Sequence, residues 1–537
     1  MKIVNVADVR VFLRRRIPLG LLLFLLVAAI YVLTTSGEIQ TIDIGETLDV
    51  AQNMVRHGSF AIPQIPVVSG GGAVAGVGGQ HFAPHGIGMS LLFAPIVLLL
   101  DAIYGVPHSS LVLFSISFVD PLLAAVGVVV LYLLARDLDV GEGPAIGVGL
   151  LFAFASTQWA YAHVAFDAIP SETFLLIAIW CLYRFSIVTE RRSWWLLCSG
   201  AALGFSVLIR AQVALAVPFA LCFLVVRSWP AIKRKDFIRA ATWFLSWGLP
   251  LLGSAAVVGW FDLVRFGSIL NNGHNSDPNT ALNFPLLSGL HGLLASPGKS
   301  IFLFAPAVVL GVIGTVAFFR KRRLFAVVVV GIVIVNLLLN AKLHNWPGDE
   351  AWGPRFLVPF VGLAVLPAAF LLVRWNRMRW LWRSAIILVG LVGVGVQLLA
   401  NAFNYLAIER SWGGITPAYY WSLSHSQFAL TVRSALRVLR GEGPYPDLAK
   451  AAGTGIPPGP VPRVDLWWVL ATDRHVHVYI VYGLVGLLLA LAVASMVLLV
   501  VHFIPVRAST GSDHREPVNS LPGVVPWQEG MGGSGYG

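Results

Sequence analysis

The sequence predicts an all-α polytopic membrane protein with about twelve transmembrane helices. The chain has 537 residues, of which 57% are hydrophobic and only 12% are charged, and its mean hydropathy is +0.78. A soluble domain carries about 25% charged residues. The three cysteines all lie in apolar segments without CxxC or CxxH spacing, so neither a disulfide framework nor a zinc site is supported.

Apolar runs long enough to cross a bilayer, roughly 17–25 residues each, recur along the chain. They fall near residues 17–35, 110–135, 143–162, 170–188, 194–210, 211–227, 240–261, 300–319, 324–341, 355–373, 384–404 and 475–503. The first run follows Arg14-Arg15-Arg16, and no small-x-small cleavage site comes after it. We therefore expect an uncleaved first helix whose N-terminus is cytoplasmic.

A further apolar run, residues 89–104, decides the topology, because it is short and is interrupted by Pro95 and Asp101. If it does not cross, the later basic clusters lie on the same side as Arg14–Arg16, as the positive-inside rule favours. These clusters are Arg191-Arg192, Lys233-Arg234-Lys235, Arg320-Lys321-Arg322-Arg323 and Arg374/Arg377/Arg379/Arg383. We predict a re-entrant or interfacial helix here and cytoplasmic termini. The clusters also account for the formal net charge of +11 without nucleic-acid binding.

The first external loop, residues 36–109, begins with a segment that is helical by pattern. Between Asp43 and His57, apolar residues recur at spacings of four, three and four, and Gly58 is a suitable C-cap. The recurring residues are Ile44, Leu48, Ala51 and Val55. An amphipathic helix of this kind would lie along the outer membrane surface.

Asp43 and Glu46 stand three residues apart at the start of this helix. One interpretation is a capping box, with Asp43 as N-cap and Glu46 reaching back from N3. The other is that a carboxylate at the membrane surface acts as general base on an acceptor hydroxyl. The spacing leaves both open. His81 and His85, later in the same loop, are candidate substrate contacts.

A second group of titratable residues lies in the short external turn before the span near 170–188. His163, Asp167 and Glu172 all fall there, and Glu172 stands at the mouth of the span, where an ionisable residue is a functional-site hypothesis. The alternative is that Ser171 or Asp167 caps the helix while Glu172 favours its N-terminal dipole. His163 and Asp167 are further candidate substrate contacts.

Arg210, Lys299 and Arg355 each lie at the external end of a span. Three cations at one depth can bind a phosphate or diphosphate, because arginine offers a bidentate fork and lysine a point charge. Each of them alone would be explained by snorkelling towards lipid headgroups.

Several motifs, taken in their order along the chain, resemble those of the GT-C fold glycosyltransferases, which use polyprenyl-phosphate-linked sugars. The similar members are bacterial protein-mannosyltransferase-like and lipid A aminoarabinose transferase-like enzymes. The resemblance covers roughly residues 17–375. The motifs are Thr41-Ile42-Asp43-Ile44-Gly45-Glu46 leading to Arg56-His57-Gly58-Ser59-Phe60, Gly79-Gln80-His81-Phe82-Ala83-Pro84-His85-Gly86, Phe266-Gly267-Ser268, Ser296-Pro297-Gly298-Lys299 and Trp352-Gly353-Pro354-Arg355-Phe356.

The resemblance implies roles for particular residues. Asp43 matches the family's catalytic carboxylate just after the first span, and Glu172 matches its second acidic position. Many relatives have an Asp-Glu pair at the first position, whereas the next acid here is Glu46. Lys299 and Arg355 lie in motifs similar to those whose cations face the lipid phosphate. Arg210 occupies a similar place.

The apolar runs and the resemblance together predict a domain organisation. Residues 1–404 would form the GT-C transmembrane catalytic domain, with juxtamembrane helices in its first external loop. Residues 405–474 would form a second external region and residues 475–505 the last transmembrane helix. The polar tail, residues 506–537, is predicted to be cytoplasmic and disordered.

The implied activity is transfer of a sugar from a polyprenyl-phosphate donor to a hydroxyl of a cell-envelope glycan, lipid or protein, on the external face of the plasma membrane. No cofactor is required, although a divalent cation on Asp43, Glu46 and Glu172 is left open. One alternative is a transporter or flippase of a lipid-linked glycan. Another is a glycan polymerase or oligosaccharyltransferase-type enzyme, but Trp467-Trp468 is followed by Val469 rather than by the aspartate of a WWD motif.

Overall fold

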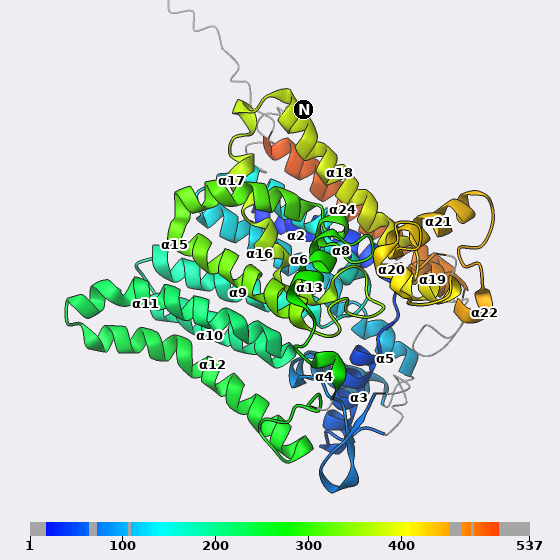
Figure 1. Cartoon of the computed structure of the whole chain (residues 1–537), viewed down its shortest axis with the longest axis horizontal. Helices are drawn as coiled ribbons and strands as arrows, with labels where there is room; N and C mark the ends of the chain where they lie inside the picture. Colours follow the sequence, from blue (N-terminus) through cyan, green and yellow to red (C-terminus); the bar gives the residue numbers. More distant parts are fainter. Residues whose placement is uncertain are drawn as a thin grey trace, which may run out of the picture.

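The computed structural model describes residues 18–63, 72–105, 109–275, 277–451, 464–473 and 477–503. Within these residues the chain is helical almost throughout, and the one sheet is the antiparallel pair β1 (Val74–Ala75) and β2 (His81–Phe82). The long helices gather in a bundle, with the first-loop helices at one end (Figure 1). Arg14–Arg16 and the predicted tail, residues 506–537, lie outside the described residues.

The bundle is built from helices of very different lengths. Its members are α2 (Leu19–Thr34), α5 (Ser109–Ile116), α6 (Val119–Asp137), α7 (Glu142–Phe154), α8 (Thr157–His163), α9 (Ala168–Ile187), α10 (Arg192–Ile209), η2 (Ala211–Ala216), α11 (Val217–Lys233), α12 (Phe237–Phe266), α14 (Ile301–Phe304), α15 (Ala307–Lys342), η4 (Arg355–Phe360), α16 (Val361–Val365), α17 (Ala368–Leu372), η5 (Trp375–Arg377), α18 (Trp380–Ala402) and α24 (Val478–Phe503). The first loop contributes α3 (Ile42–His57), η1 (Val77–Gly79) and α4 (Ile87–Tyr104). The remaining segments contain η3 (Pro278–Thr280), α13 (Leu286–Ala295), α19 (Tyr405–Ser411), α20 (Pro417–Trp421), α21 (Gln427–Leu439), α22 (Leu448–Ala451) and α23 (Trp467–Asp473).

In the described part of the chain, ten helices are long and apolar enough to cross a membrane, or eleven if α7 and α8, which meet at 51°, form one span. That set includes α4 and leaves out α2, which has 16 residues. It counts α15 once, although its backbone leaves the helical conformation at Arg322, where two helical arms meet. The chain is therefore a multi-pass, all-α membrane protein, as predicted.

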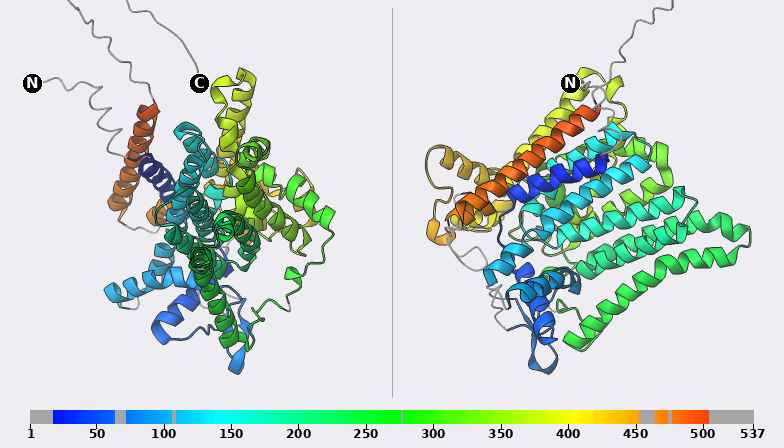
Figure 2. Two further views of the ribbon diagram at one scale, coloured as in Figure 1. Left: turned by 90° about the vertical axis from the view of Figure 1, so that its left-hand side faces the viewer. Right: turned by 180° about the vertical axis from the view of Figure 1, so that it is seen from behind.

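Basic clusters from different turns share one end of the bundle, which we call the basic end. Arg322, between the two arms of α15, pairs with Asp139 just after α6. Arg192 and Arg239, near the starts of α10 and α12, both lie over the ring of Trp243, at 4.7 and 5.3 Å. Figure 2 shows the α11–α12 turn and the C-terminal end of α24 at the basic end of the bundle. This arrangement agrees with the charge pattern expected from the sequence.

The opposite end, which we call the α3 end, carries α3, α4 and α5 (Figure 1). Here α4 packs along α3: Ser90 Oγ donates to the carbonyl of Thr47 at 2.7 Å, and Arg56 pairs with Asp101 at 2.8 Å. Although α4 is long enough to span, it packs with the other helices of the first loop. Its interfacial position in the membrane stays a prediction.

The helix predicted from Asp43 to His57 is confirmed as α3, and Gly58 ends it with a left-handed φ of 63°. The capping box is wrong, because Thr41 is the N-cap and makes no side-chain capping bond. Asp43 instead stands in the first turn of the helix. Glu46, only 1% exposed, is paired with a histidine of the same loop.

Candidate active site

A cavity of about 690 Å³ lies at the α3 end, bordered by α3, α10, α12, α15 and the loops between them. Its wall combines charged groups with apolar side chains such as Val258, Leu339 and Leu343. The acidic, basic and histidine residues that line it are Asp43, Glu46, His85, Asp167, Arg210, Asp262, Arg265, His274, Asp277, Asp349 and Arg355. A mixed wall of this kind suits a ligand with a polar head and an apolar tail.

Asp43 lies in this cavity, and 38% of its side chain is exposed. Its Oδ2 is 3.5 Å from Arg355 Nη1, and its Oδ1 is 3.9 Å from His85 Nε2. Burial raises the pKa of Asp43, but the charges of His85, Arg355 and Arg210 together outweigh burial and hold the pKa below its ordinary value. Asp43 is therefore ionised at neutral pH, as a proton acceptor must be.

His85 joins Asp43 to Glu46, since its Nε2 also lies 3.2 Å from Glu46 Oε2. Burial lowers the pKa of His85, but the two carboxylates outweigh this effect and raise it. Burial raises the pKa of Glu46, and His85 opposes that rise. His85 thus lies between the two carboxylates, and both of them favour its protonated form. Among the described residues, no group of three or more His, Cys, Asp or Glu side chains is arranged to hold a metal ion.

Two arginines lie side by side in the cavity wall. Arg355 Nη2 is 2.9 Å from Asp349 Oδ2, and Arg210 Nε donates to Asp167 Oδ2 at 3.1 Å. Both guanidinium groups lie over the ring of Phe356, at 4.7 and 5.5 Å. The buried Nε of Arg355 has no hydrogen-bond partner in the described part of the chain. It is therefore a buried donor whose hydrogen-bonding capacity is unsatisfied.

The backbone that carries Arg355 is anchored by residues that the sequence did not single out. Gln212 Nε2 and Asn340 Nδ2 donate to the carbonyl of Phe356 at 3.2 and 3.3 Å. Gln212 also donates to Asn336 Oδ1 at 3.1 Å. The sequence signal was present: Asn336 and Asn340 are two amides one helical turn apart in an otherwise apolar span.

Arg265, near the end of α12, holds the backbone of the loop that bears His85. Its Nη1 donates to the carbonyls of Ala83 and His85, the latter at 3.1 Å. Its Nη2 pairs with Asp262 Oδ1 at 2.7 Å, and its side chain is 2% exposed. Sequence reasoning missed this pair, although an Asp and an Arg at i, i+3 in a span end are a detectable signal.

A polar rim formed by residues 271–275 and 277–280 also went unpredicted. Asn272, His274, Asp277 and Asn279 line the cavity from this segment. The His274 ring lies 6.1 Å from that of His85, and burial together with His85 lowers the pKa of His274. The run of amide and acidic residues directly after α12 was the available sequence signal.

Lys299, predicted to bind phosphate, does not line the cavity. Its ammonium group is fully buried and donates to the carbonyls of Asp349 and Ala351 at 2.8 and 2.6 Å. Burial lowers the pKa of Lys299, although the nearby Glu409 raises it. Lys299 therefore supports the loop that leads to Arg355, and it would affect a ligand only through that loop.

Three other predicted residues also lie outside the cavity lining. Glu172 is fully buried in α9, and its Oε1 accepts a hydrogen bond from the amide of Gly362 at 2.6 Å. His163 Nε2 lies 3.0 Å from Asp465 Oδ2, in a buried contact that ties the end of α8 to the segment before α23. His81 is in β2, where its carbonyl accepts from the amide of Ile62 at 2.8 Å. Asp167, five residues before Glu172, lines the cavity instead.

The fold and the cavity define a polytopic membrane protein with an ionic site at one end of its bundle. Residues 97–253 match the family model described as dolichyl-phosphate-mannose-protein mannosyltransferase. This match confirms the predicted resemblance over that segment of the chain. No curated protein matches the chain.

The solved structures to which the chain is similar include two proteins. One is ArnT from Cupriavidus metallidurans bound to undecaprenyl phosphate, at 13% identity and a TM-score of 0.45, covering 90% of this chain and 76% of that one. The other is the oligosaccharyltransferase AglB from Archaeoglobus fulgidus in complex with an inhibitory peptide and a dolichol-phosphate, at 11% identity and a TM-score of 0.44. That match covers 70% of this chain and only 55% of AglB, so the present chain spans about half the length of that relative.

Proposed function

We propose that the protein transfers a sugar from a polyprenyl-phosphate-linked donor to a hydroxyl acceptor, with Asp43 as general base. The observation that carries the proposal is the meeting of an ionised carboxylate with two arginines in one cavity. Asp43 comes from the first loop, whereas Arg210 and Arg355 come from the ends of two later spans. The acceptor is a glycan, lipid or protein of the cell envelope.

The two arginines suit a lipid phosphate. Arginine binds phosphate through parallel N–H donors, and both Arg210 and Arg355 line the cavity. The carboxylates of Asp43, Asp167 and Asp349 pair with these cations. The apolar wall around Val258, Leu339 and Leu343 suits the first isoprene units of the donor.

The chemistry needs one proton acceptor and one stabilised leaving group. Asp43 takes the proton of the acceptor hydroxyl as its oxygen forms a bond to the anomeric carbon. The bond between the anomeric carbon and the phosphate oxygen breaks, and the electron pair leaves with the lipid phosphate. Arg355 and Arg210 stabilise that negative charge as it develops.

Asp167 is a better partner for this reaction than Glu172. Asp167 lines the cavity and holds Arg210 in place, and its Oδ1 has no hydrogen-bond partner within the described residues. Glu172 is buried against Gly362 instead. Its role is to join α9 to α16.

The α3 end faces the outside of the plasma membrane in this proposal, and the basic end faces the cytoplasm. The gathering of basic clusters at the far end from Asp43 supports this orientation. Cysteine labelling from outside the cell tests it. External labelling of Ser193→Cys or Lys321→Cys, both near the basic end, would overturn the proposed orientation.

The decisive experiment is reconstitution into lipid vesicles with a panel of polyprenyl-phosphate sugars and lipid-linked oligosaccharides. Asp43→Asn is expected to abolish sugar transfer while leaving donor binding within a few-fold of wild type. Asp101→Asn is a matched control, because it removes a first-loop carboxylate that lies outside the cavity. Full transfer by the Asp43→Asn protein would remove the assigned base.

The same panel separates the competing functions. Movement of the lipid across the bilayer without any sugar transfer would indicate a transporter or flippase. Transfer restricted to whole lipid-linked oligosaccharides would indicate a polymerase or oligosaccharyltransferase-type enzyme.

A further inference from the structure

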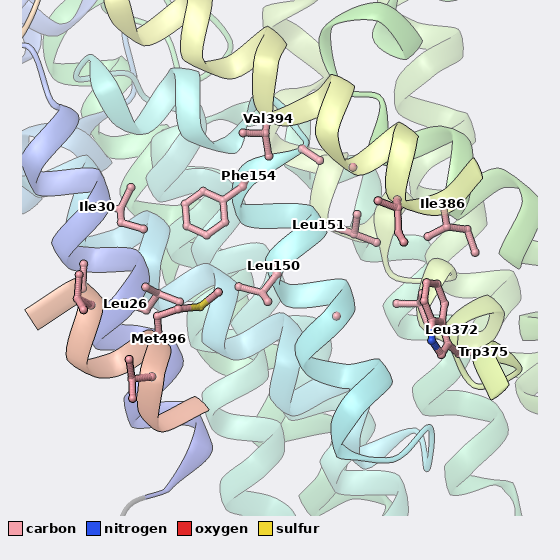
Figure 3. Close-up of a pocket in the computed structure, with 17 residues that line it drawn as sticks. Leu26, Ile30, Leu150, Leu151, Phe154, Leu372, Trp375, Ile386, Val394 and Met496 are labelled. Atoms are coloured by element: carbon pink, nitrogen blue, oxygen red, sulfur yellow. The ribbon is translucent and has the colours of Figure 1, made fainter. Parts of the chain in front are cut away.

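A second cavity, of about 660 Å³, lies between α2, α7, α18 and α24, away from the candidate active site. Figure 3 shows side chains of Leu26, Phe154, Val394 and Met496 around it. Every residue that lines it is apolar, including the glycines Gly147 and Gly390. Exposed lining residues on α18 and α24 leave it open to the bundle surface, as a groove. The exposed lining residues are Ile387, Val493, Met496 and Val497.

Water does not suit this groove. A buried water needs two to four polar partners, and the lining residues are all apolar. The groove faces the hydrocarbon region, because α18 and α24 are both long enough and apolar enough to span. Its volume lies in the roughly 300–1,000 Å³ range of small-ligand sites. An apolar chain is therefore the ligand that this groove fits.

The groove runs towards the basic end. Its lining includes Leu372, the last residue of α17, and Trp375, in the turn that joins α17 to α18 (Figure 3). Arg383 lies 5.9 Å over the Trp375 ring and donates to the Trp375 carbonyl at 2.9 Å. An arginine is thus placed directly on a residue of the groove wall.

Three more arginines surround this turn: Arg374, Arg377 and Arg379. All three are exposed, and none forms an ion pair with another described residue. Glu142, the acid that begins α7 near this end, is already paired with His502 at 3.5 Å. The mouth of the groove therefore carries cations in excess, and basic pockets between transmembrane helices bind anionic lipid headgroups.

We propose that this groove and the arginines of the α17–α18 turn form a binding site for one anionic phospholipid. An acyl chain occupies the apolar groove, and the phosphate headgroup binds Arg374, Arg377 and Arg379. Two independent features carry the assignment: an apolar groove that only a hydrocarbon chain fits, and unpaired cations at its mouth. The site is separate from the proposed sugar-transfer site and does not depend on it.

The test uses full-length protein purified in mild detergent and stripped of lipid. Dioleoyl phosphatidylglycerol or dioleoyl phosphatidylcholine is added, and native mass spectrometry counts the lipids retained. Wild type should retain one phosphatidylglycerol in strong preference to phosphatidylcholine. Gly390→Phe should abolish retention, because the ring would fill the groove. Gly395→Phe on the same helix is the matched control, since Gly395 lies outside the groove lining and faces open space.

A second pair of variants tests the headgroup without touching the packed interior. Arg377→Gln/Arg379→Gln should lower the preference for phosphatidylglycerol by roughly tenfold or more. Arg320→Gln/Arg323→Gln removes two exposed arginines at the same end of the bundle, away from the groove, and should change nothing. Equal binding of the two lipids by wild type, or full retention by Gly390→Phe, would overturn the proposal. So would retention of a polyprenyl phosphate that Gly390→Phe loses, because the groove would then hold the carrier lipid.

Discussion

Arg265 offers the sharpest test of how the candidate site is held together. Arg265→Met removes the partner of Asp262, whose side chain is only 7% exposed. It also frees the carbonyls of Ala83 and His85. Removing one member of a buried ion pair costs about 3–5 kcal/mol, because the other charge is left uncompensated. The variant should therefore be clearly less stable than wild type.

The double variant Asp262→Leu/Arg265→Met separates stability from positioning. Replacing a buried pair by apolar residues of similar volume is often neutral, so most of the lost stability should return. The loop that bears His85 nevertheless stays unanchored. A misplaced catalytic group costs about 10- to 100-fold in rate, so we expect sugar transfer to remain that far below wild type.

Thermal unfolding in detergent and transfer by vesicles measure these two effects. Arg239→Met is the control, since it makes the same substitution at the exposed start of α12, the helix that bears Arg265. If Arg265→Met unfolds at the same temperature as Arg239→Met, the ion pair is not structurally important. If the double variant recovers full transfer, the pair does not position the His85 loop.

Three further predictions concern the support of the site. Lys299→Met should raise the donor KM by roughly tenfold with a smaller change in kcat, because the loop before Arg355 loses its anchor. A fall in kcat as large as the rise in KM would contradict a positioning role. Gly86→Ala should lower the free energy of unfolding by about 1–3 kcal/mol, since a Cβ would lie 2.2 Å from the carbonyl oxygen of Leu208. Gly248→Ala, where a Cβ would meet open space, should not destabilise the protein. Similar unfolding temperatures for the two variants would refute this reasoning. Because the pKa of His85 is raised in the folded protein, protonated His85 stabilises the folded state fully below about pH 6.5, and this stabilisation is lost as the pH rises through the folded-state pKa. His85→Asn should therefore remove the corresponding pH dependence of the unfolding temperature. An unchanged pH dependence would exclude His85 as its source.

The membrane fold was predictable because its signal is local. Each apolar run predicts a span from its own composition, and the basic turns between the runs predict which side of the membrane each turn faces. The run at residues 89–104 shows where this reasoning needs help, since length and composition alone classify α4 as a span. Its contacts with α3 support the interfacial interpretation that charge counting favoured.

The candidate site was predictable only in part. Asp43, His85, Arg210 and Arg355 do lie in one cavity, although their roles stay proposals. Lys299 was placed on the phosphate because an external cation at a span end looks the same whether it faces a ligand or a backbone carbonyl. Arg265 was overlooked because its role depends on hydrogen bonds to the loop that bears His85, which is distant in the sequence.

The sequence by itself determined that this protein is a helical membrane protein that resembles the GT-C glycosyltransferases, with a charged first loop after its first span. Hydropathy and short motifs carry that information, since both depend on neighbours along the chain. Only the tertiary structure decided which charges meet. It placed Asp167 rather than Glu172 in the cavity of Asp43, and it enclosed Lys299 behind the loop of Arg355. Asp167 and Glu172 were separated because Asp167 is the N-cap of α9, at the cavity, whereas Glu172 lies within α9 and is buried in the packed interior.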